Sequence, residues 1–199
     1  MQFSCPFILA SGSPRRKHLL QQLGVAFEIQ VSDVEESFDE RLSPEEIVEQ
    51  IALRKVQSIG QQNGRALVLA ADTIVVLDGE ILGKPADPEE AIQMLRRLSG
   101  NSHVVYTGLA LLHRPSDRLV TAHEKTTVYF DEMSDEEIIS YVSSGSPMDK
   151  AGGYGIQDDR GGLFIERIEG DFYNVVGLPL HRLYNVIKQE FGDLLQAGF

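Results

Sequence analysis

The sequence predicts an α/β fold in which a mixed, twisted sheet is flanked by helices. Segments with the apolar runs or two-residue alternation of strands interleave along the chain with segments of helical spacing. Helix-capping signals separate these segments. The chain has 199 residues and shows no linker, repeat or low-complexity stretch. We therefore expect one domain over residues 1–199, long enough to bury a core.

The N-terminal elements follow from local signals. Residues 7–10 are apolar and predict a short buried strand. Ser13 then precedes Pro14, which is typical of an N-cap followed by the first helical position. Residues 27–31 alternate as a strand does. Ser43 opens a second helix, because Ser-Pro-Glu-Glu is a capping box and helical apolar spacing follows it.

The middle of the chain predicts a strand, a hairpin turn and a third helix. Residues 66–77 are apolar except for Asp72 and Thr73. The Asp-Gly pair at 78–79 is a hairpin signal before a short strand. Asp87, followed by proline and two glutamates, caps the next helix.

The second half continues the alternation of element types. Residues 103–113 and 119–129 predict two long strands joined by a turn. Ser134 opens another capping box. Residues 163–168 predict a strand, and Leu-Pro at 178–179 begins a last amphipathic helix.

The charge balance excludes some classes of partner. The chain has 18 lysines and arginines against 30 aspartates and glutamates, a net charge of −12. A protein that coats a nucleic acid polymer or lies on an anionic membrane uses positive surface potential, so we expect neither partner. A small anion in a local basic pocket remains compatible with this charge.

Composition also bears on compartment and chemistry. Cys5 is the one cysteine, so an intrachain disulfide and a cysteine-rich zinc site are excluded. No signal peptide or membrane-spanning apolar stretch is recognisable, and we expect a soluble cytoplasmic protein. The motifs of zincins and of serine hydrolases are missing from the sequence.

The first candidate site lies where the first strand turns into the first helix. A helix N-terminus offers free N–H groups and positive dipole potential to an anion. Hydroxyls and guanidinium groups at the same place suit a phosphate chain. The residues concerned are Ser11, Ser13, Arg15 and Arg16. The alternative is a capped helix that carries exposed arginines.

The second candidate is Asp72, which interrupts an apolar strand. Burying a carboxylate is costly unless it is paired, binds a metal or opens into a cleft. The alternative is an aspartate that caps a loop at a strand end. Lys55 and Lys84 are further candidates, and each alone is also compatible with a solvated lysine.

Two further segments carry polar groups. Glu35 and Glu36 lie in an acidic stretch over residues 33–40, which is a metal-ligand candidate or a solvated charge run. Residues 150–157 combine glycines with Tyr154 and Gln157, and they either shape a base pocket or simply make a turn.

Together these segments resemble the Maf family of nucleoside triphosphate pyrophosphatases. The motifs occur in family order and cover essentially the whole chain. They are Ala-Ser-Gly-Ser-Pro-Arg-Arg at 10–16, Val-Glu-Glu at 34–36, Lys55, Ala-Ala-Asp-Thr at 70–73, Gly-Lys-Pro at 83–85, Leu-Ser-Gly at 98–100, Thr-Gly at 107–108, Asp-Lys-Ala-Gly-Gly-Tyr-Gly-Ile-Gln at 149–157 and Gly-Asp-Phe-Tyr-Asn-Val-Val-Gly-Leu-Pro at 170–179.

The resemblance implies hydrolysis of a nucleoside triphosphate to the monophosphate and pyrophosphate with a divalent cation. It also implies an elongated α/β fold with two lobes and a central cleft, related to inosine triphosphatases, and it allows a homodimer. Ser-Pro-Arg-Arg with Tyr-Gly-Ile-Gln is similar to the branch that acts on dTTP and UTP, with modified pyrimidine nucleotides left open. By this carry-over Arg15, Thr73 and Gln157 set the base specificity.

These expectations combine into a mechanistic hypothesis. Hydrolysis at the α-phosphorus requires charge neutralisation, an oriented water and a stabilised leaving group. Asp72 is the predicted general base, and Glu36 and Asp72 would hold Mg²⁺ or Mn²⁺, with Glu35 as an optional further ligand. Tyr154 would supply a wall for the base. The predicted phosphate ligands are Ser11, Ser13, Arg16, Lys55 and Lys84, with Arg15 as an alternative to Arg16.

Two other classes of protein are alternatives to the enzyme. A nucleotide-binding regulatory protein of cell division without turnover would use the same basic loop, but the carboxylates Asp72 and Glu36 would repel its anion. An RNA-binding module is excluded by the net charge of −12 and by the lack of a basic-aromatic motif.

Overall fold

The computed structural model describes residues 1–39, 41–157 and 160–196, and it divides into two compact units. Unit 1 comprises Met1–Asp72, Thr107–Glu124 and Gly177–Phe199, and unit 2 comprises Thr73–Tyr106 and Lys125–Val176. Three long strands run through both units. The expectation of one domain over residues 1–199 stays a prediction.

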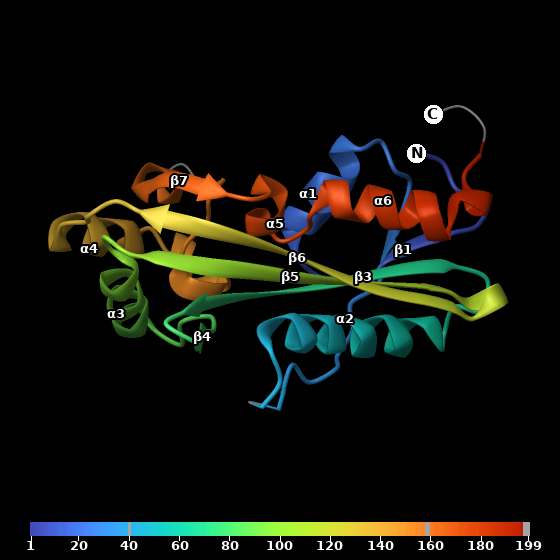
Figure 1. Cartoon of the computed structure of the whole chain (residues 1–199), viewed down its shortest axis with the longest axis horizontal. Coiled ribbons are helices and arrows are strands. Elements are labelled where there is room, and N and C mark those ends of the chain that lie inside the picture. Colours follow the sequence, from blue (N-terminus) through green and yellow to red (C-terminus); the bar gives the residue numbers. More distant parts are fainter. Residues whose placement is uncertain (40, 158–159, 197–199) are drawn as a thin grey trace. The chain divides into compact units, whose positions relative to one another are not determined.

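The described strands form one sheet of mixed direction (Figure 1). Their order is β2-β1-β3-β5-β6-β7, and β4 pairs with β3 off this path. β1 pairs in parallel with β2 and β3, whereas β3–β4 and β6–β7 are antiparallel. The mixed α/β class is therefore confirmed. The strands are β1 (Phe7–Leu9), β2 (Glu28–Ile29), β3 (Leu67–Leu77), β4 (Glu80–Leu82), β5 (Ser102–His113), β6 (Arg118–Phe130) and β7 (Ile165–Glu169).

Unit 1 packs helices on both faces of its part of the sheet. Figure 1 draws α2 (Pro44–Gly60) on one face and α1 (Pro14–Gln22) and α6 (Leu180–Glu190) on the other. The buried face of α2 has helical spacing, and burying such a stripe provides most of a helix's stability. Its apolar cluster joins α2 to β1, β3 and β5 through Ala52, Val56, Ile59, Ile8, Val68, Ala70, Ala110 and Leu112.

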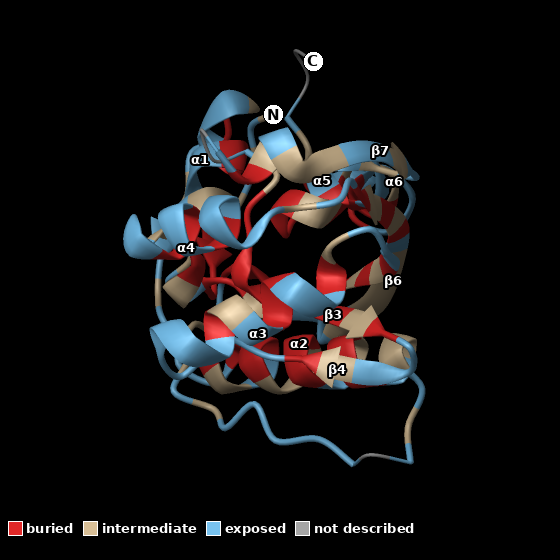
Figure 2. Ribbon diagram, turned by 90° about the vertical axis from the view of Figure 1, so that its left-hand side faces the viewer, coloured by how far each residue is buried: buried red, intermediate tan, exposed pale blue. Residues whose placement is uncertain are grey.

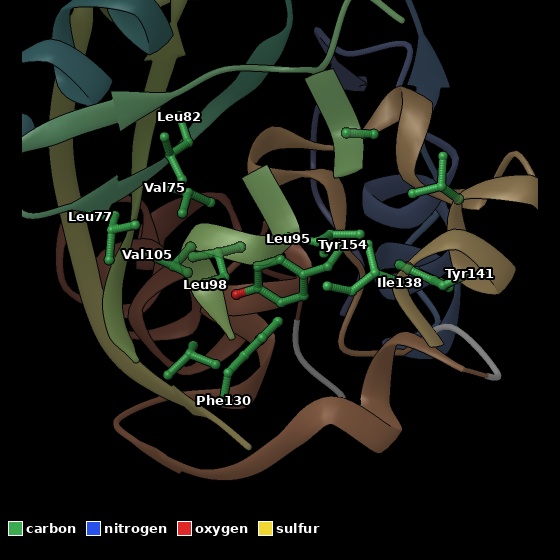
Figure 3. Close-up of a cluster of buried hydrophobic side chains, with 13 residues drawn as sticks. Val75, Leu77, Leu82, Leu95, Leu98, Val105, Phe130, Ile138, Tyr141 and Tyr154 are labelled. Atoms are coloured by element: carbon green, nitrogen blue, oxygen red, sulfur yellow. The ribbon is translucent and has the colours of Figure 1, made fainter. Parts of the chain in front are cut away.

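Unit 2 encloses a second apolar cluster, drawn in Figure 3. Leu95 and Leu98 come from α3 (Pro88–Leu98), and Ile138 and Tyr141 come from α4 (Asp135–Ser143). Figure 2 shows exposed residues on the outer turns of α4, as expected for a helix that buries one face. The remaining helix is α5 (Phe172–Val176), and the 3-10 turns are Arg114–Ser116, Ser146–Asp149, Ala151–Gly153, Gly161–Phe164 and Gly192–Leu194.

Four of the predicted helix starts are confirmed by side-chain capping bonds. Ser13 accepts from the Arg16 N–H at the start of α1. Ser43 and Ser134 open full capping boxes at α2 and α4, and Asp87 caps α3. The predicted hairpin turn at 78–79 joins β3 to β4, with positive φ at both residues.

Three segments differ from the sequence-based expectation. The strand predicted over 27–31 is limited to Glu28–Ile29, which pair with Ile8 and Leu9 at the end of β1. The strand predicted from Leu163 begins at Ile165, after a 3-10 turn. α5 was not predicted, although Asp171 Oδ1 accepts from the Asn174 N–H at 2.9 Å and caps it. Within the described ranges, every helix is too short or too polar to span a bilayer.

Candidate active site

The loop between β1 and α1 gathers the first group of predicted site residues. Ser11 is buried at the end of the strand, and its Oγ accepts from the Ser13 N–H and from Arg16 Nη1, both at 3.2 Å. Arg16 Nε donates to the Gly177 carbonyl at 2.7 Å. Arg16 is therefore fixed against the chain before α6, and Arg15 beside it is partly exposed.

Lys55 is the centre of the second group. Its Nζ donates to Asp72 Oδ1 and to Glu36 Oε1, each at 2.6 Å. The side chains of Lys55 and Asp72 are 9% and 10% exposed, whereas that of Glu36 is 55% exposed. One ammonium therefore joins a buried carboxylate in β3 to an accessible one in the loop over residues 33–39.

The environment of Asp72 perturbs its acidity in opposing directions. Burial raises the pKa of the Asp72 carboxyl, and the positive charges of Lys55 and Arg16 partly offset this rise. Burial likewise lowers the pKa of the Arg16 guanidinium, and the charge of Asp72 opposes that change. Such perturbed groups cluster at functional sites because catalysis needs proton affinities matched to the working pH.

The acidic loop that carries Glu36 is tied to the same helix as Lys55. Arg54, the residue before Lys55 in α2, donates through Nη2 to the carbonyl of Ser37. The sequence does not predict the contacts of Arg54 and of the Gly177 carbonyl. An arginine on a helix cannot be told from a solvated one by its neighbours, and a backbone oxygen has no residue type that marks it. Gly177 does fall within the family-like motif over 170–179.

Unit 2 carries the other predicted site residues. Lys84 is exposed in the loop after β4, and Gln157 is exposed in a turn. The Gly152 N–H donates to the Gly83 carbonyl at 2.9 Å, so the segment leading to Gln157 is bonded to the loop of Lys84. Thr73, the first residue of unit 2, is partly exposed in β3.

Gln157 lines a polar pocket of about 680 Å³ within unit 2. The other lining groups are mostly hydroxyls from the end of α4 and the turn after it, together with one guanidinium. They are Ser140, Tyr141, Ser143, Ser144, Ser146 and Arg160.

The expectation for Tyr154 is wrong. We predicted that its ring would wall a base pocket, but the residue is 4% exposed and belongs to the apolar cluster of unit 2. Figure 3 shows the ring among the cluster's aliphatic side chains. The glycines beside Tyr154 allow a tight backbone path. Their presence in the sequence does not predict whether the ring faces a pocket or the apolar cluster.

The carboxylates of unit 1 offer a limited set of metal ligands. No group of three or more histidine, cysteine, aspartate or glutamate side chains is close enough to hold a metal among the described residues. Asp72 and Glu36 do converge on the same ammonium. Mg²⁺ is usually bound by one or two carboxylates, with waters and substrate phosphates completing its shell, so this pair fits such an ion.

The whole chain is similar to known proteins. Residues 6–190 match the family described as Maf-like protein. The chain is 54% identical to the dTTP/UTP pyrophosphatase of Salinibacter ruber, covering 100% of this chain and 97% of the relative. It is 50% identical to the dTTP/UTP pyrophosphatase of Caldicellulosiruptor bescii, covering 96% and 97%.

One solved structure supports the fold. The Staphylococcus aureus Ham1 protein superimposes with a TM-score of 0.51 and 16% identity, over 93% of this chain and 99% of that chain. At this identity the similarity concerns the fold alone.

Proposed function

Since the chain belongs to the Maf family, we propose that it is a nucleoside triphosphate pyrophosphatase that hydrolyses dTTP and UTP to the monophosphate and pyrophosphate. The full-length relatives at 54% and 50% identity carry this name. The buried Asp72–Lys55 pair, joined to Glu36, is the observation that best supports hydrolytic chemistry in this chain.

Asp72 is the proposed general base. It would accept a proton from water while the water oxygen bonds to the α-phosphorus and the bond to the pyrophosphate leaving group breaks. Its burial supports this role, because a carboxyl of raised pKa has greater proton affinity than a solvated one. Lys55 would hold the carboxylate in place through the bond at 2.6 Å.

The basic residues are proposed to neutralise the triphosphate. In unit 1, Arg16 and the hydroxyls of Ser11 and Ser13 lie at the start of α1, where the positive end of the helix dipole favours an anion. The ammonium of Lys55 would also neutralise negative charge on the triphosphate. The ammonium of Lys84 in unit 2 is exposed and would bind phosphate oxygens.

A divalent cation, Mg²⁺ or Mn²⁺, is the proposed cofactor. Glu36 and Asp72 are its proposed protein ligands, and Glu35 beside them is exposed. When bound, the ion supplies charge neutralisation of the phosphate oxygens.

Base selection is assigned to Arg15, Thr73 and Gln157. The Gln157 amide presents one donor group and one acceptor, which suits the edge of a pyrimidine. We further propose that the protein works in the cytoplasm, and that it can form a homodimer.

Pyrophosphate release tests the activity and its base preference together. The wild-type protein is incubated with a panel of nucleotides, with and without Mg²⁺ or Mn²⁺. Release from dTTP and UTP well above that from purine nucleotides supports the proposal. Nucleotide binding without release from any of them would favour a regulatory protein instead.

Asp72→Asn tests the general base. Removing the proton acceptor should lower kcat by at least about 100-fold, the usual contribution of such a group, while nucleotide binding stays measurable. Asp78→Asn is the matched control, since Asp78 is exposed in the β3–β4 turn and asparagine tolerates its positive φ. Turnover close to that of the wild type in Asp72→Asn would refute the assignment.

A further inference from the structure

A polar pair is buried in the apolar cluster of unit 2. His103 Nε2 and Tyr154 Oη are joined by a hydrogen bond of 2.6 Å. His103 in β5 is 2% exposed, and both rings pack edge-to-face against Phe130 at centroid distances of 5.2 and 4.8 Å. The proposed mechanism uses neither residue.

Burying this pair in an apolar core costs desolvation free energy. His103 Nδ1 is buried without a hydrogen-bond partner among the described residues, so the bond to Tyr154 provides the partner of Nε2 alone. Burial lowers the pKa of His103 to about 4, which keeps the imidazole neutral. Apolar rings of similar shape would avoid the cost of desolvating both groups. Buried polar bonds of this kind can specify one arrangement of a core.

The backbone after Tyr154 is held on several sides. The Gly155 N–H donates to Tyr141 Oη of α4 at 3.3 Å. A Cβ at Gly161 would lie 2.5 Å from the Gly155 carbonyl oxygen, and one at Gly162 would lie 2.8 Å from that of Ile156. The chain therefore packs glycine backbone directly against this segment.

The segment over residues 152–157 connects two groups of the proposed site. Gln157 lies three residues after Tyr154, on the backbone that these contacts hold. Two residues before Tyr154, the Gly152 N–H is bonded to the Gly83 carbonyl in the loop of Lys84. Short stretches of chain thus couple the position of Tyr154 to Gln157 on one side and to the loop of Lys84 on the other.

We propose that His103 is a positioning residue for base selection: through its hydrogen bond to Tyr154 Oη it sets the backbone from which Gln157 meets the pyrimidine edge. This inference rests on the proposed function. A glutamine amide has a donor side and an acceptor side, so a displaced Gln157 would distinguish uracil from cytosine less well.

Tyr154→Phe removes the hydroxyl and keeps the ring. We expect the ratio of kcat/KM for UTP to that for CTP to fall about tenfold, mainly through a higher KM for UTP, which is the scale of one lost recognition bond. Tyr129→Phe is the matched control. Tyr129 Oη bonds to Glu169 at 3.1 Å on an exposed part of the same unit, and its removal should leave the ratio unchanged.

A double variant separates positioning from stability. Tyr154→Phe leaves His103 without a partner for either nitrogen, and this costs stability. His103→Leu with Tyr154→Phe removes both polar groups, so its Tm should lie closer to that of the wild type than does the Tm of either single variant. The selectivity ratio should nevertheless remain low.

Two results would overturn the inference. One is a wild-type selectivity ratio in Tyr154→Phe, and the other is recovery of both Tm and the ratio in the double variant. Failure of the proposed function is seen separately, because wild-type protein would then release no pyrophosphate from dTTP or UTP.

Discussion

Lys55 pairs with the same two carboxylates that are the proposed metal ligands. Its ammonium lies 2.6 Å from oxygens of both Asp72 and Glu36, at the place where the proposed metal ion would bind. A buried carboxylate without a cation is strongly destabilising, so the lysine stabilises Asp72 in its ionised form. The same ammonium should also compete with a divalent cation for the two carboxylates.

Lys55→Met should therefore strengthen metal binding. Without nucleotide, we expect the Kd for Mn²⁺ to fall about tenfold, because a positive charge close to both ligands is removed. Electron paramagnetic resonance of free Mn²⁺ during titration measures this independently of turnover. Lys84→Met is the control and should keep the wild-type Kd. An unchanged Kd in Lys55→Met would mean that the lysine and the metal do not share these carboxylates.

Residues differ in how much of their role is readable from sequence. Asp72 could be identified as a candidate because burying a carboxylate inside an apolar strand is costly unless it is paired or binds a ligand. Lys55 could not be distinguished from a solvated lysine by its own surroundings in the sequence, since its partners come from a loop and from β3. The sequence around Tyr154 and His103 does not predict their burial, because it depends on packing in unit 2.

At the scale of elements, locally coded features were predicted and tertiary ones were not. Caps such as that at Ser43 depend on a few neighbouring residues, so helix starts follow from sequence. The length of β2 depends on its partner strand, and the turn over Gly161–Phe164 depends on backbone packed from elsewhere. The roles of Thr73, Lys84 and Gln157 remain predictions, since they rest on family resemblance.

Gly108 gives the packing of β5 against α2 a specific test. A Cβ at Gly108 would lie 2.3 Å from the Val48 carbonyl carbon and oxygen, so the helix backbone would have to move. Gly108→Ala should reduce the free energy of unfolding by about 1–3 kcal/mol, the cost of overpacking, measured by urea denaturation. Gly64→Ala, where the added Cβ meets nothing within 4 Å, should be nearly neutral. Equal midpoints for the two variants would contradict this account.

For the whole molecule, the net charge of −12 and a proposed polyanionic substrate are compatible because charge acts locally. Seven of the 30 acidic residues lie in the first turns of α2, α3 and α4. Asp72 and Glu36 are balanced by Lys55 and Arg16. An excess of negative charge would repel long polyanions, while a metal-bound triphosphate carries less charge to the site.

The global stability should depend on pH through His103. Burial lowers its pKa from 6.5 to about 4, so between these values the unfolded chain binds a proton that the folded chain does not. The contribution of His103 to stability is then largest above pH 6.5 and is lost as the pH falls toward 4. The loss from this group amounts to about 3 kcal/mol across the window, at 1.36 kcal/mol per pKa unit.

The double variant His103→Leu with Tyr154→Phe isolates this contribution. Urea denaturation of the wild type and of the variant near neutral pH and at about pH 4.5 gives the two losses of unfolding free energy. The variant should lose about 2–3 kcal/mol less than the wild type, because it lacks the group that protonates on unfolding. His113, whose pKa burial also lowers, is present in both proteins and cancels. If both proteins lost the same free energy on acidification, His103 would have to bind its proton in the folded state as readily as in the unfolded chain. That result would contradict the assignment of His103 as a buried neutral imidazole bonded to Tyr154.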